Sequence, residues 1–259
     1  MRILYIILLI LVGLTCLRYH NNQATIINMN ITEAKAQEHN DLGAKFYNDG
    51  RIDDAIDEFE KATKLNPNIA STHYNLGNAY FDRGNYAEAA KEYEKTDIID
   101  NQYPYVHHNL GMAYYNMDDI ARAIYEYKLE LVTNPNDAQT HFNLGNAYYD
   151  QGLTDDSIRE YRTAIMLDPK YAAAYYNLGN IYYDLNMPQN AIDEYKKTLE
   201  IEPNHTGAHN NLGNIYYSQN LIMMAKTEYL TALSIDPANE QARSNLVLTN
   251  KILEGNATN

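Results

Sequence analysis

The chain of 259 residues is 45% hydrophobic and 21% charged, a composition that is typical of a folded protein and unlike that of a disordered one. Its formal net charge of −14 would repel a polyanion over most of the surface, so we do not expect nucleic acid as a partner. A single cysteine, Cys16, excludes an intramolecular disulfide and a metal site built from several thiolates.

The N-terminal segment, residues 1–17, combines a charged start at Arg2 with an apolar run that is broken only by Gly13 and Thr15. This pattern predicts a signal peptide or a membrane anchor, so we expect the protein to be membrane-anchored or exported, in a cell envelope, a periplasm or a secretory pathway. The run is short for a membrane span, but no small-x-small cleavage site follows it closely. Removal and retention of the segment therefore both stay open. Lipidation of Cys16 is a weaker option, because the preceding residues do not fit the bacterial lipoprotein pattern.

After a polar linker at residues 18–35, the chain repeats itself with a constant period of 34 residues and no insertion. The stretch NLGNAYY at residues 143–149 recurs in similar form at 41–47, 75–81, 109–115, 177–183 and 211–217. A constant period of this length predicts a stack of units, each of which buries its apolar face against its neighbours. The six units are residues 36–69, 70–103, 104–137, 138–171, 172–205 and 206–239.

Each unit reads as two helices with a polar break between them. The break carries glycine or asparagine in most units, at Gly50, Gly84, Gly152, Asn186 and Asn220. The second helix carries a small residue and an aromatic residue four positions apart, which places both on one face. These pairs are Ala55/Phe59, Ala89/Tyr93, Ala123/Tyr127, Ser157/Tyr161, Ala191/Tyr195 and Ala225/Tyr229. A proline then stops the second helix, at Pro67, Pro135, Pro169, Pro203 and Pro237.

This set of residues resembles the tetratricopeptide repeat family. In the first unit the family pattern appears as His39, Leu42, Gly43, Phe46, Ala55, Phe59, Ala62 and Pro67. The resemblance covers residues 36–239 and implies an all-α fold, a right-handed α-solenoid (superhelix) of antiparallel helix pairs. Three features depart from the pattern: Asn101 stands in place of proline, Glu130 stands in place of a small residue, and the family's usual tryptophan is replaced by His39, His73, His107, His141, Tyr175 and His209. We therefore expect irregular packing near Asn101 to Pro104, at the junction of the second and third units.

The repeat pattern weakens after the sixth unit. Residues 240–253 contain Leu246 in register with the earlier leucines, but Val247 replaces the glycine. This combination predicts a terminal capping helix, which is not packed on a following unit. Residues 254–259 then form a short tail.

The first helix of each unit has two different faces. In the fourth unit Leu144, Gly145 and Tyr148 lie on one side, and Asn143 and Asn146 lie on the other. The first side is the packing side, where the glycine lets two helices approach closely. The apolar burial that this permits outweighs the cost in helix propensity, about 1 kcal/mol relative to alanine.

We expect the opposite side to face the concave groove that such stacks use for binding. It presents two rows of asparagines. One row is Asn75, Asn109, Asn143, Asn177 and Asn211, and the other is Asn78, Asn146, Asn180 and Asn214. A carboxamide carries two donors and an acceptor, so it can pair with the backbone of an extended peptide. The resemblance implies the same role, since asparagines like these hold a ligand's backbone in related tetratricopeptide proteins.

Aromatic and apolar residues complete the predicted peptide-binding site. Tyr74, His108, Phe142 and Tyr176 run along the flank of the groove, and Phe81, Tyr115, Tyr149, Tyr183 and Tyr217 form an aromatic wall. Met112 makes the third unit the least polar part, suited to an apolar or aromatic side chain of the ligand. No lysine or arginine occupies these positions, whereas Asp82, Asp150 and Asp184 do, so we expect a neutral or basic extended segment as the ligand.

Residues that could carry catalysis do not converge in the sequence. His39, His73, His107, His141 and His209 recur once per unit on the packing side, with Tyr175 in the fifth unit. Packing is therefore favoured over a metal site at His107 and His108. We expect no cofactor and no enzyme, because phosphate-loop, GxSxG, HExxH and paired CxxC motifs are absent.

The sequence therefore predicts a non-enzymatic adaptor that binds an extended segment of a protein partner, with an envelope assembly factor as a close variant. The alternative is a self-associating structural scaffold that uses the ends or the convex face of the stack.

Overall fold

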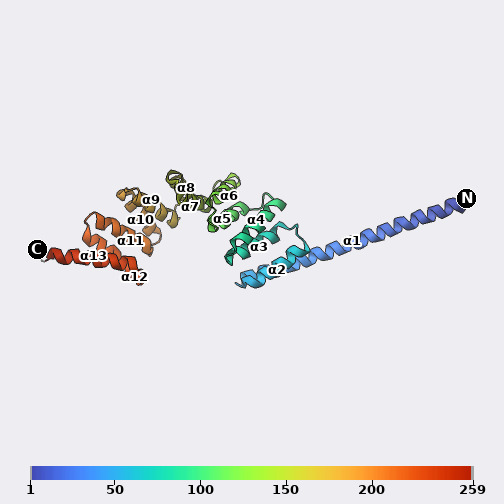
Figure 1. The fold of residues 1–259 in the computed structure, drawn as a ribbon, viewed down its shortest axis with the longest axis horizontal. Helices are drawn as coiled ribbons and strands as arrows, with labels where there is room; N and C mark the ends of the chain where they lie inside the picture. The colour runs from blue at the N-terminus through green and yellow to red at the C-terminus, as the bar shows by residue number, and fades with distance from the viewer. Residues whose placement is uncertain (1, 258–259) are drawn as a thin grey trace. The chain divides into compact units, whose positions relative to one another are not determined.

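The computed structural model describes residues 2–257, with side chains described over 28–254 and at Arg18, Tyr19, Gln23 and Thr25. Within this part of the chain, every regular element is a helix (Figure 1). The signal peptide or anchor predicted at residues 1–17 lies outside the residues whose side chains are described. Across the described residues, none of the helices is both long and apolar enough to span a bilayer.

The chain divides into two compact units, residues 1–126 and 127–259, and the boundary falls within helix α6. The first unit contains α1 (Arg2–Asn48), α2 (Ile52–Leu65), α3 (Ala70–Asp82), α4 (Tyr86–Ile99), α5 (Val106–Asn116) and the start of α6 (Ile120–Thr133). The second contains the rest of α6, α7 (Ala138–Asp150), α8 (Thr154–Leu167), α9 (Ala172–Asp184), α10 (Pro188–Ile201), α11 (Thr206–Ser218), α12 (Ile222–Ile235) and α13 (Glu240–Ala257).

Helices that follow one another along the chain pack together in each compact unit. In the first unit α1 packs on α2 and α3 on α4; in the second α7 packs on α8, α9 on α10 and α11 on α12. Within each compact unit a pair also contacts the first helix of the next pair, as α2 does α3 and α10 does α11. The predicted all-α class and the α-solenoid arrangement of antiparallel helix pairs are confirmed.

A glycine of the first helix meets an aromatic ring of the second helix in each described pair. A Cβ atom added to Gly145 would lie 2.8 Å from the Tyr161 ring, and one added to Gly179 would lie 2.7 Å from the Tyr195 ring. Phe59, Tyr93 and Tyr229 stand in the same way against Gly43, Gly77 and Gly213. All of these rings are buried. The prediction that the glycine permits a close approach of two helices is confirmed.

The breaks between paired helices use the left-handed backbone conformation. Gly84 has φ of 85° and Gly152 has φ of 77°, while Asn186 and Asn220 take the same place with φ of 55° and 59°. Glycine adopts this conformation without a steric cost, and asparagine tolerates it better than most residues. The polar breaks read from the sequence are therefore the turns that reverse the chain.

Three segments depart from the regular pattern. α5 begins at Val106, two residues later in its unit than α3 or α7 in theirs, because Pro104 and the left-handed Tyr105 (φ of 60°) precede it. The predicted irregularity at this junction is confirmed. α13 continues to Ala257, so residues 254–257 are helical and not part of a tail. Residues 18–35, predicted as a linker, lie within the continuous helix α1.

The glycine contact makes a prediction for Gly145→Ala. Overpacking against Tyr161 should cost about 1–3 kcal/mol, which exceeds the gain of about 1 kcal/mol in helix propensity. Urea denaturation followed by circular dichroism should therefore show a less stable protein. In a Tyr161→Ala background the ring is absent, and the same substitution should become stabilising. Stabilisation by Gly145→Ala in the wild-type background would contradict this account.

Candidate functional site

The predicted asparagine rows are hydrogen-bonded to each other within the protein. In the second compact unit Asn177 donates from Nδ2 to Oδ1 of Asn146 at 2.9 Å, and Asn211 donates to Asn180 at 3.0 Å. The same bond continues into the capping helix α13, where Asn245 donates to Asn214 at 2.8 Å. In the first compact unit Asn109 donates to Asn78 at 3.1 Å. These bonds link the first helices of successive pairs, and we call them the asparagine ladder.

A tyrosine hydroxyl from the second helix supports each rung of the ladder. Tyr161 donates to Oδ1 of Asn146 at 2.6 Å, and Tyr195 donates to Oδ1 of Asn180 at 2.8 Å. Tyr93 and Tyr229 make the same bond with Asn78 and Asn214. Burial raises the pKa of Tyr161 to about 12, so its hydroxyl keeps its proton and acts as a donor at neutral pH.

The first pair of helices lacks both the ladder asparagine and the tyrosine hydroxyl. Ala44 stands there in place of the asparagine, and Phe59 stands in place of the tyrosine. With no carboxamide to accept a hydrogen bond, a hydroxyl buried at this point would be unsatisfied, which costs about 1–3 kcal/mol. In the third repeat, by contrast, Met112 stands in place of the asparagine while Tyr127 keeps its hydroxyl, so the tyrosine is also present where the asparagine is absent.

The ladder leaves a donor and an acceptor unused on the rung between Asn146 and Asn177. Oδ1 of Asn146 already accepts two hydrogen bonds, from Tyr161 and Asn177, while its Nδ2 makes none among the described residues. Oδ1 of Asn177 is likewise without a donor in the described part of the chain. Asn143 makes no side-chain hydrogen bond to any described residue. A peptide backbone offers the complementary N–H and C=O groups, so the ladder keeps the capacity to bind one.

The predicted flank rings pack against the turns that precede the next pair of helices. The ring centroid of Tyr74 lies 4.8 Å from that of Tyr103, Phe142 lies 4.9 Å from Tyr171, and Tyr176 lies 4.4 Å from His205. These three flank rings are half-buried. His108 is only 5% exposed, so a ligand in the groove would not reach it in this conformation. The flank therefore exposes only part of each of these three rings.

The predicted aromatic wall is the more accessible part of the site. Tyr149 and Tyr183 are 41% and 44% exposed, and Phe81, Met112, Tyr115 and Tyr217 are half-buried. The hydroxyl of Tyr149 donates to Oδ2 of Asp184 at 2.8 Å, and that of Tyr47 donates to Asp82. A tyrosine of one pair thus holds the groove aspartate of the next.

The packing histidines take part in ion pairs that sequence analysis missed. Nδ1 of His141 lies 2.6 Å from Oε2 of Glu160, and Nδ1 of His209 lies 2.7 Å from Glu228. His39, His73 and His107 pair in the same way with Glu58, Glu92 and Glu126. The available signal was a glutamate 19 residues after each histidine. Each pair ties the two helices of one unit together on the packing side.

The hydrogen-bond acceptors around His141 and His209 require the positively charged, imidazolium form of these two rings. Nε2 of His141 lies 3.1 Å from the carbonyl oxygen of Pro135, and Nε2 of His209 lies 3.0 Å from that of Pro203. Both ring nitrogens then face acceptors, and only the imidazolium form can donate from both. The hydrogen bonds to Glu160 and Glu228 accordingly raise the pKa of these two histidines.

The fifth 34-residue repeat, residues 172–205, lacks the packing histidine. Tyr175 replaces it, and the matching glutamate, Glu194, has its pKa raised by burial. The carboxyl group thus loses a charge partner and gains a preference for its neutral form. Among the described residues, no group of three His, Cys, Asp or Glu side chains could hold a metal ion.

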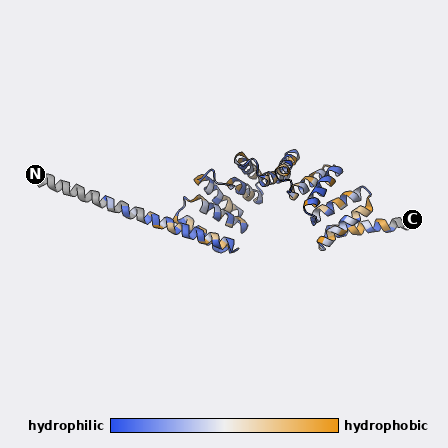
Figure 2. Cartoon of the chain, turned by 180° about the vertical axis from the view of Figure 1, so that it is seen from behind, coloured by the Kyte–Doolittle hydropathy of each residue, from blue (hydrophilic) through white to orange (hydrophobic). Residues whose placement is uncertain are grey.

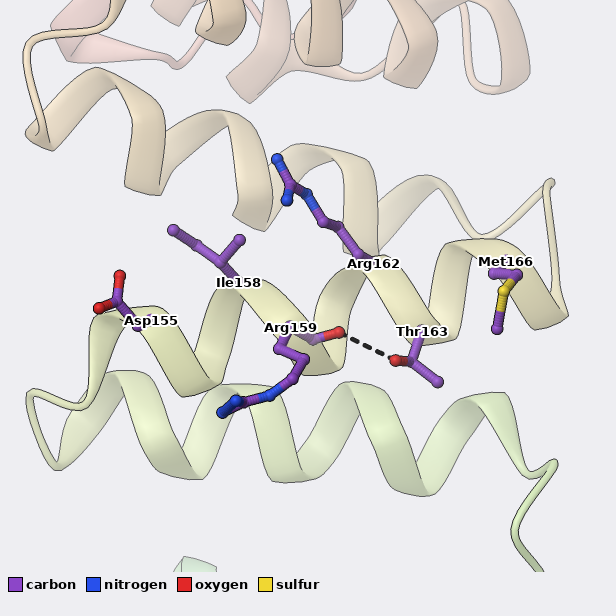
Figure 3. Close-up of a pocket in the computed structure, with 6 residues that line it drawn as sticks. All are labelled: Asp155, Ile158, Arg159, Arg162, Thr163 and Met166. Carbon is purple, nitrogen blue, oxygen red and sulfur yellow. Dashed lines mark hydrogen bonds between the residues drawn. The ribbon is translucent and has the colours of Figure 1, made fainter.

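A cavity of about 490 Å³ lies along α8 (Figure 3). Arg159 and Arg162 point to opposite sides of this helix. Both already have partners, since Arg159 pairs with Asp156 and Arg162 donates to the hydroxyl of Tyr182 at 2.6 Å. No residue of the ladder lines the cavity. We therefore place the candidate site on the ladder and the aromatic wall.

Comparison with protein families gives matches along most of the chain. A model of the tetratricopeptide repeat matches residues 40–104 and 108–165, and further models of this repeat match residues 172–205 and 206–239. A model described as TPR repeat matches residues 145–186. Comparison with curated protein sequences gave no match.

Solved structures of similar fold include MamA, at 28% identity and a TM-score of 0.60, covering 62% of this chain and 95% of that one. PilF of Pseudomonas aeruginosa has a TM-score of 0.69 at 14% identity, covering 82% of this chain and 97% of that one. YrrB, described as a TPR protein with an unusual peptide-binding site, has a TM-score of 0.60 at 22% identity, covering 71% and 94%. The last two likenesses concern the fold alone.

The histidine pairs predict how stability changes with pH. The folded pKa of His141 and His209 is raised above the unfolded value of about 6.5. The stabilisation is therefore fully present below about pH 6.5 and is lost as the pH rises through the folded pKa. Melting temperatures measured between about pH 6 and about pH 9 should fall less in the variant His141→Gln/His209→Gln than in the wild type. Parallel curves for the two proteins would refute the role of these pairs.

Proposed function

The chain belongs to the tetratricopeptide repeat family, and we propose that it is a non-enzymatic scaffold that binds an extended segment of a protein partner along the asparagine ladder. The observation that carries the proposal is the unused Nδ2 donor and Oδ1 acceptor on the rungs, as at Asn146 and Asn177. These groups match the backbone of an extended peptide, whatever its side chains. The peptide-binding site of YrrB offers a precedent in a protein of the same fold.

The charge of the groove favours a neutral or basic segment. The acidic side chains Asp82 and Asp184 stand on the wall, and each accepts a hydrogen bond from a tyrosine. The ladder and the wall contain no lysine or arginine. An acidic segment would therefore meet repulsion, and a basic one would bind more weakly as the salt concentration rises.

We further propose that the N-terminal segment places the repeats at or beyond a membrane, where the protein serves as an envelope assembly factor. The support is the sequence of residues 1–17, with its charged start at Arg2 and the apolar run that follows. Proteinase treatment of cells tests this location. If the repeats lie beyond the cytoplasmic membrane, the proteinase should digest them while that membrane is still intact.

The variant Asn146→Asp/Asn180→Asp tests the ladder without breaking it. Aspartate keeps an oxygen that accepts from Tyr161 or Tyr195 and from the next asparagine, but it lacks the outward NH₂ group. The peptide is one selected on the wild type from a phage-displayed random library. Loss of two hydrogen bonds of about 1 kcal/mol each should lower its affinity by about tenfold or more. Fluorescence anisotropy on the full chain measures the affinity.

The added negative charge needs its own control. Gln139→Glu adds a charge to α7 outside the ladder and should leave the affinity within about twofold for an uncharged peptide. Equal melting temperatures would show that the stack is intact. Unchanged peptide affinity in the ladder variant would refute binding through the asparagines.

A second candidate function, a self-associating scaffold, is favoured by the surface at the end of the chain. Figure 2 shows hydrophobic stretches on the C-terminal helices. Met223 on α12 is 64% exposed and Val247 on α13 is 50% exposed, with Met224, Leu230 and Leu248 also exposed. Exposed apolar surface of this kind is a feature of protein interfaces.

Self-association makes a separate prediction. The full chain should form dimers or larger species when treated with a lysine-reactive cross-linker, and Met223→Ser/Met224→Ser should reduce them severalfold. Ile98→Ser, on the exposed surface of α4 in the other compact unit, is the matched control. Cross-linked species that persist equally in both variants would exclude the C-terminal surface as the interface.

A further inference from the structure

A cavity of about 230 Å³ opens in the groove between α9, α11 and α13. Tyr183 and Tyr217 of the aromatic wall line it, together with Asn214, Asn245, Ser218 and Leu248. Sites for whole small molecules usually measure roughly 300–1,000 Å³. This cavity is therefore of a size for one side chain of a bound segment.

The cavity exists because two residues depart from the repeat. Ser218 stands where Asp184 and Asp82 accept the hydroxyl of the preceding wall tyrosine, so Tyr183 makes no such bond among the described residues. Leu248 stands where Asn180 and Asn214 continue the ladder. The bond that holds tyrosine and aspartate together across the groove is therefore absent here, and one wall is apolar.

The polar groups of the cavity form an adjacent donor and acceptor. Oδ1 of Asn214 accepts from Tyr229 at 2.9 Å and from Nδ2 of Asn245 at 2.8 Å. Both of its lone pairs are used, which leaves the Nδ2 donors of Asn214 and the Oδ1 acceptor of Asn245 for a ligand. The two side chains are bonded to each other, so this donor and acceptor lie side by side.

The lining selects against charged and purely apolar ligands. It contains no ionisable acid or base other than tyrosine, so an ionised side chain would lose its water without gaining a charge partner. A hydrocarbon side chain would leave the Asn214 donor and the Asn245 acceptor unpaired. A carboxamide satisfies both groups, while its methylene stem packs on Leu248 and the tyrosine rings.

We propose that this cavity is a subsite for the carboxamide of a glutamine or asparagine in the bound segment. The proposal rests on the proposed function, because it needs an extended segment in the groove. It adds a requirement for one carboxamide side chain to a ladder that pairs with the backbone of the segment.

The experiment is selection of a phage-displayed random dodecapeptide library on the immobilised full chain. Peptides retained by the wild type should share a glutamine or asparagine at one position. Ser218→Asp introduces the residue that bonds the wall tyrosine at Asp82 and Asp184, and this should close the cavity. The variant should still retain peptides but without that preference. Ser218→Ala, which adds no carboxylate, should keep the preference for glutamine or asparagine.

Affinities of one selected peptide make the test quantitative. Replacing its glutamine by glutamate or leucine should weaken binding to the wild type by about tenfold or more. On Ser218→Asp the three peptides should bind alike. Equal melting temperatures of the two variants and the wild type establish that the stack is intact.

The outcomes separate the subsite from the groove. Retained peptides with no glutamine or asparagine position, or the same preference in Ser218→Asp, would overturn the subsite and leave the proposed function standing. Failure of the wild type to retain any peptide would overturn the proposed function, and the subsite with it.

Discussion

The contact between a helical glycine and a buried aromatic ring is the constraint on which the rest of this structure depends. Gly145 lets Tyr161 lie against the backbone of α7, and this contact fixes the distance between the paired helices. The same ring carries the hydroxyl that holds Oδ1 of Asn146. Packing on one side of a helix thus sets the orientation of a polar side chain on the other. The candidate site follows from the core and is not added to it.

The sequence predicted the parts of this fold that depend on period and on local conformation. The constant spacing indicated the paired helices, Gly145 indicated a close approach, and Asn101 marked the irregular start of α5. Helical periodicity assigns a residue to a face, but it does not identify the partner of that residue across the stack. The bonds between Asn146 and Asn177, and between His141 and Glu160, join positions 31 and 19 residues apart, so they became visible only in the structure. For the same reason the burial of His108 was not foreseen.

Departures from the repeat show what the repeated interactions do. Where the ladder asparagine is missing, at Ala44, the supporting ring is Phe59 and lacks the hydroxyl. Where the histidine is missing, at Tyr175, burial raises the pKa of Glu194. Ser218 belongs to the same class of change, since it removes the acceptor that a wall tyrosine uses elsewhere. Each departure identifies a position where one of the repeated interactions is lost.

The ladder also has a direction. In each compact unit, the asparagine nearer the C-terminus donates and the one nearer the N-terminus accepts, as Asn211 does to Asn180 and Asn109 to Asn78. The free donors and acceptors consequently repeat in one order along each unit. A peptide backbone is itself directional, because its N–H and C=O groups alternate differently when the chain is reversed. A ligand that pairs with successive rungs would therefore have a preferred chain polarity.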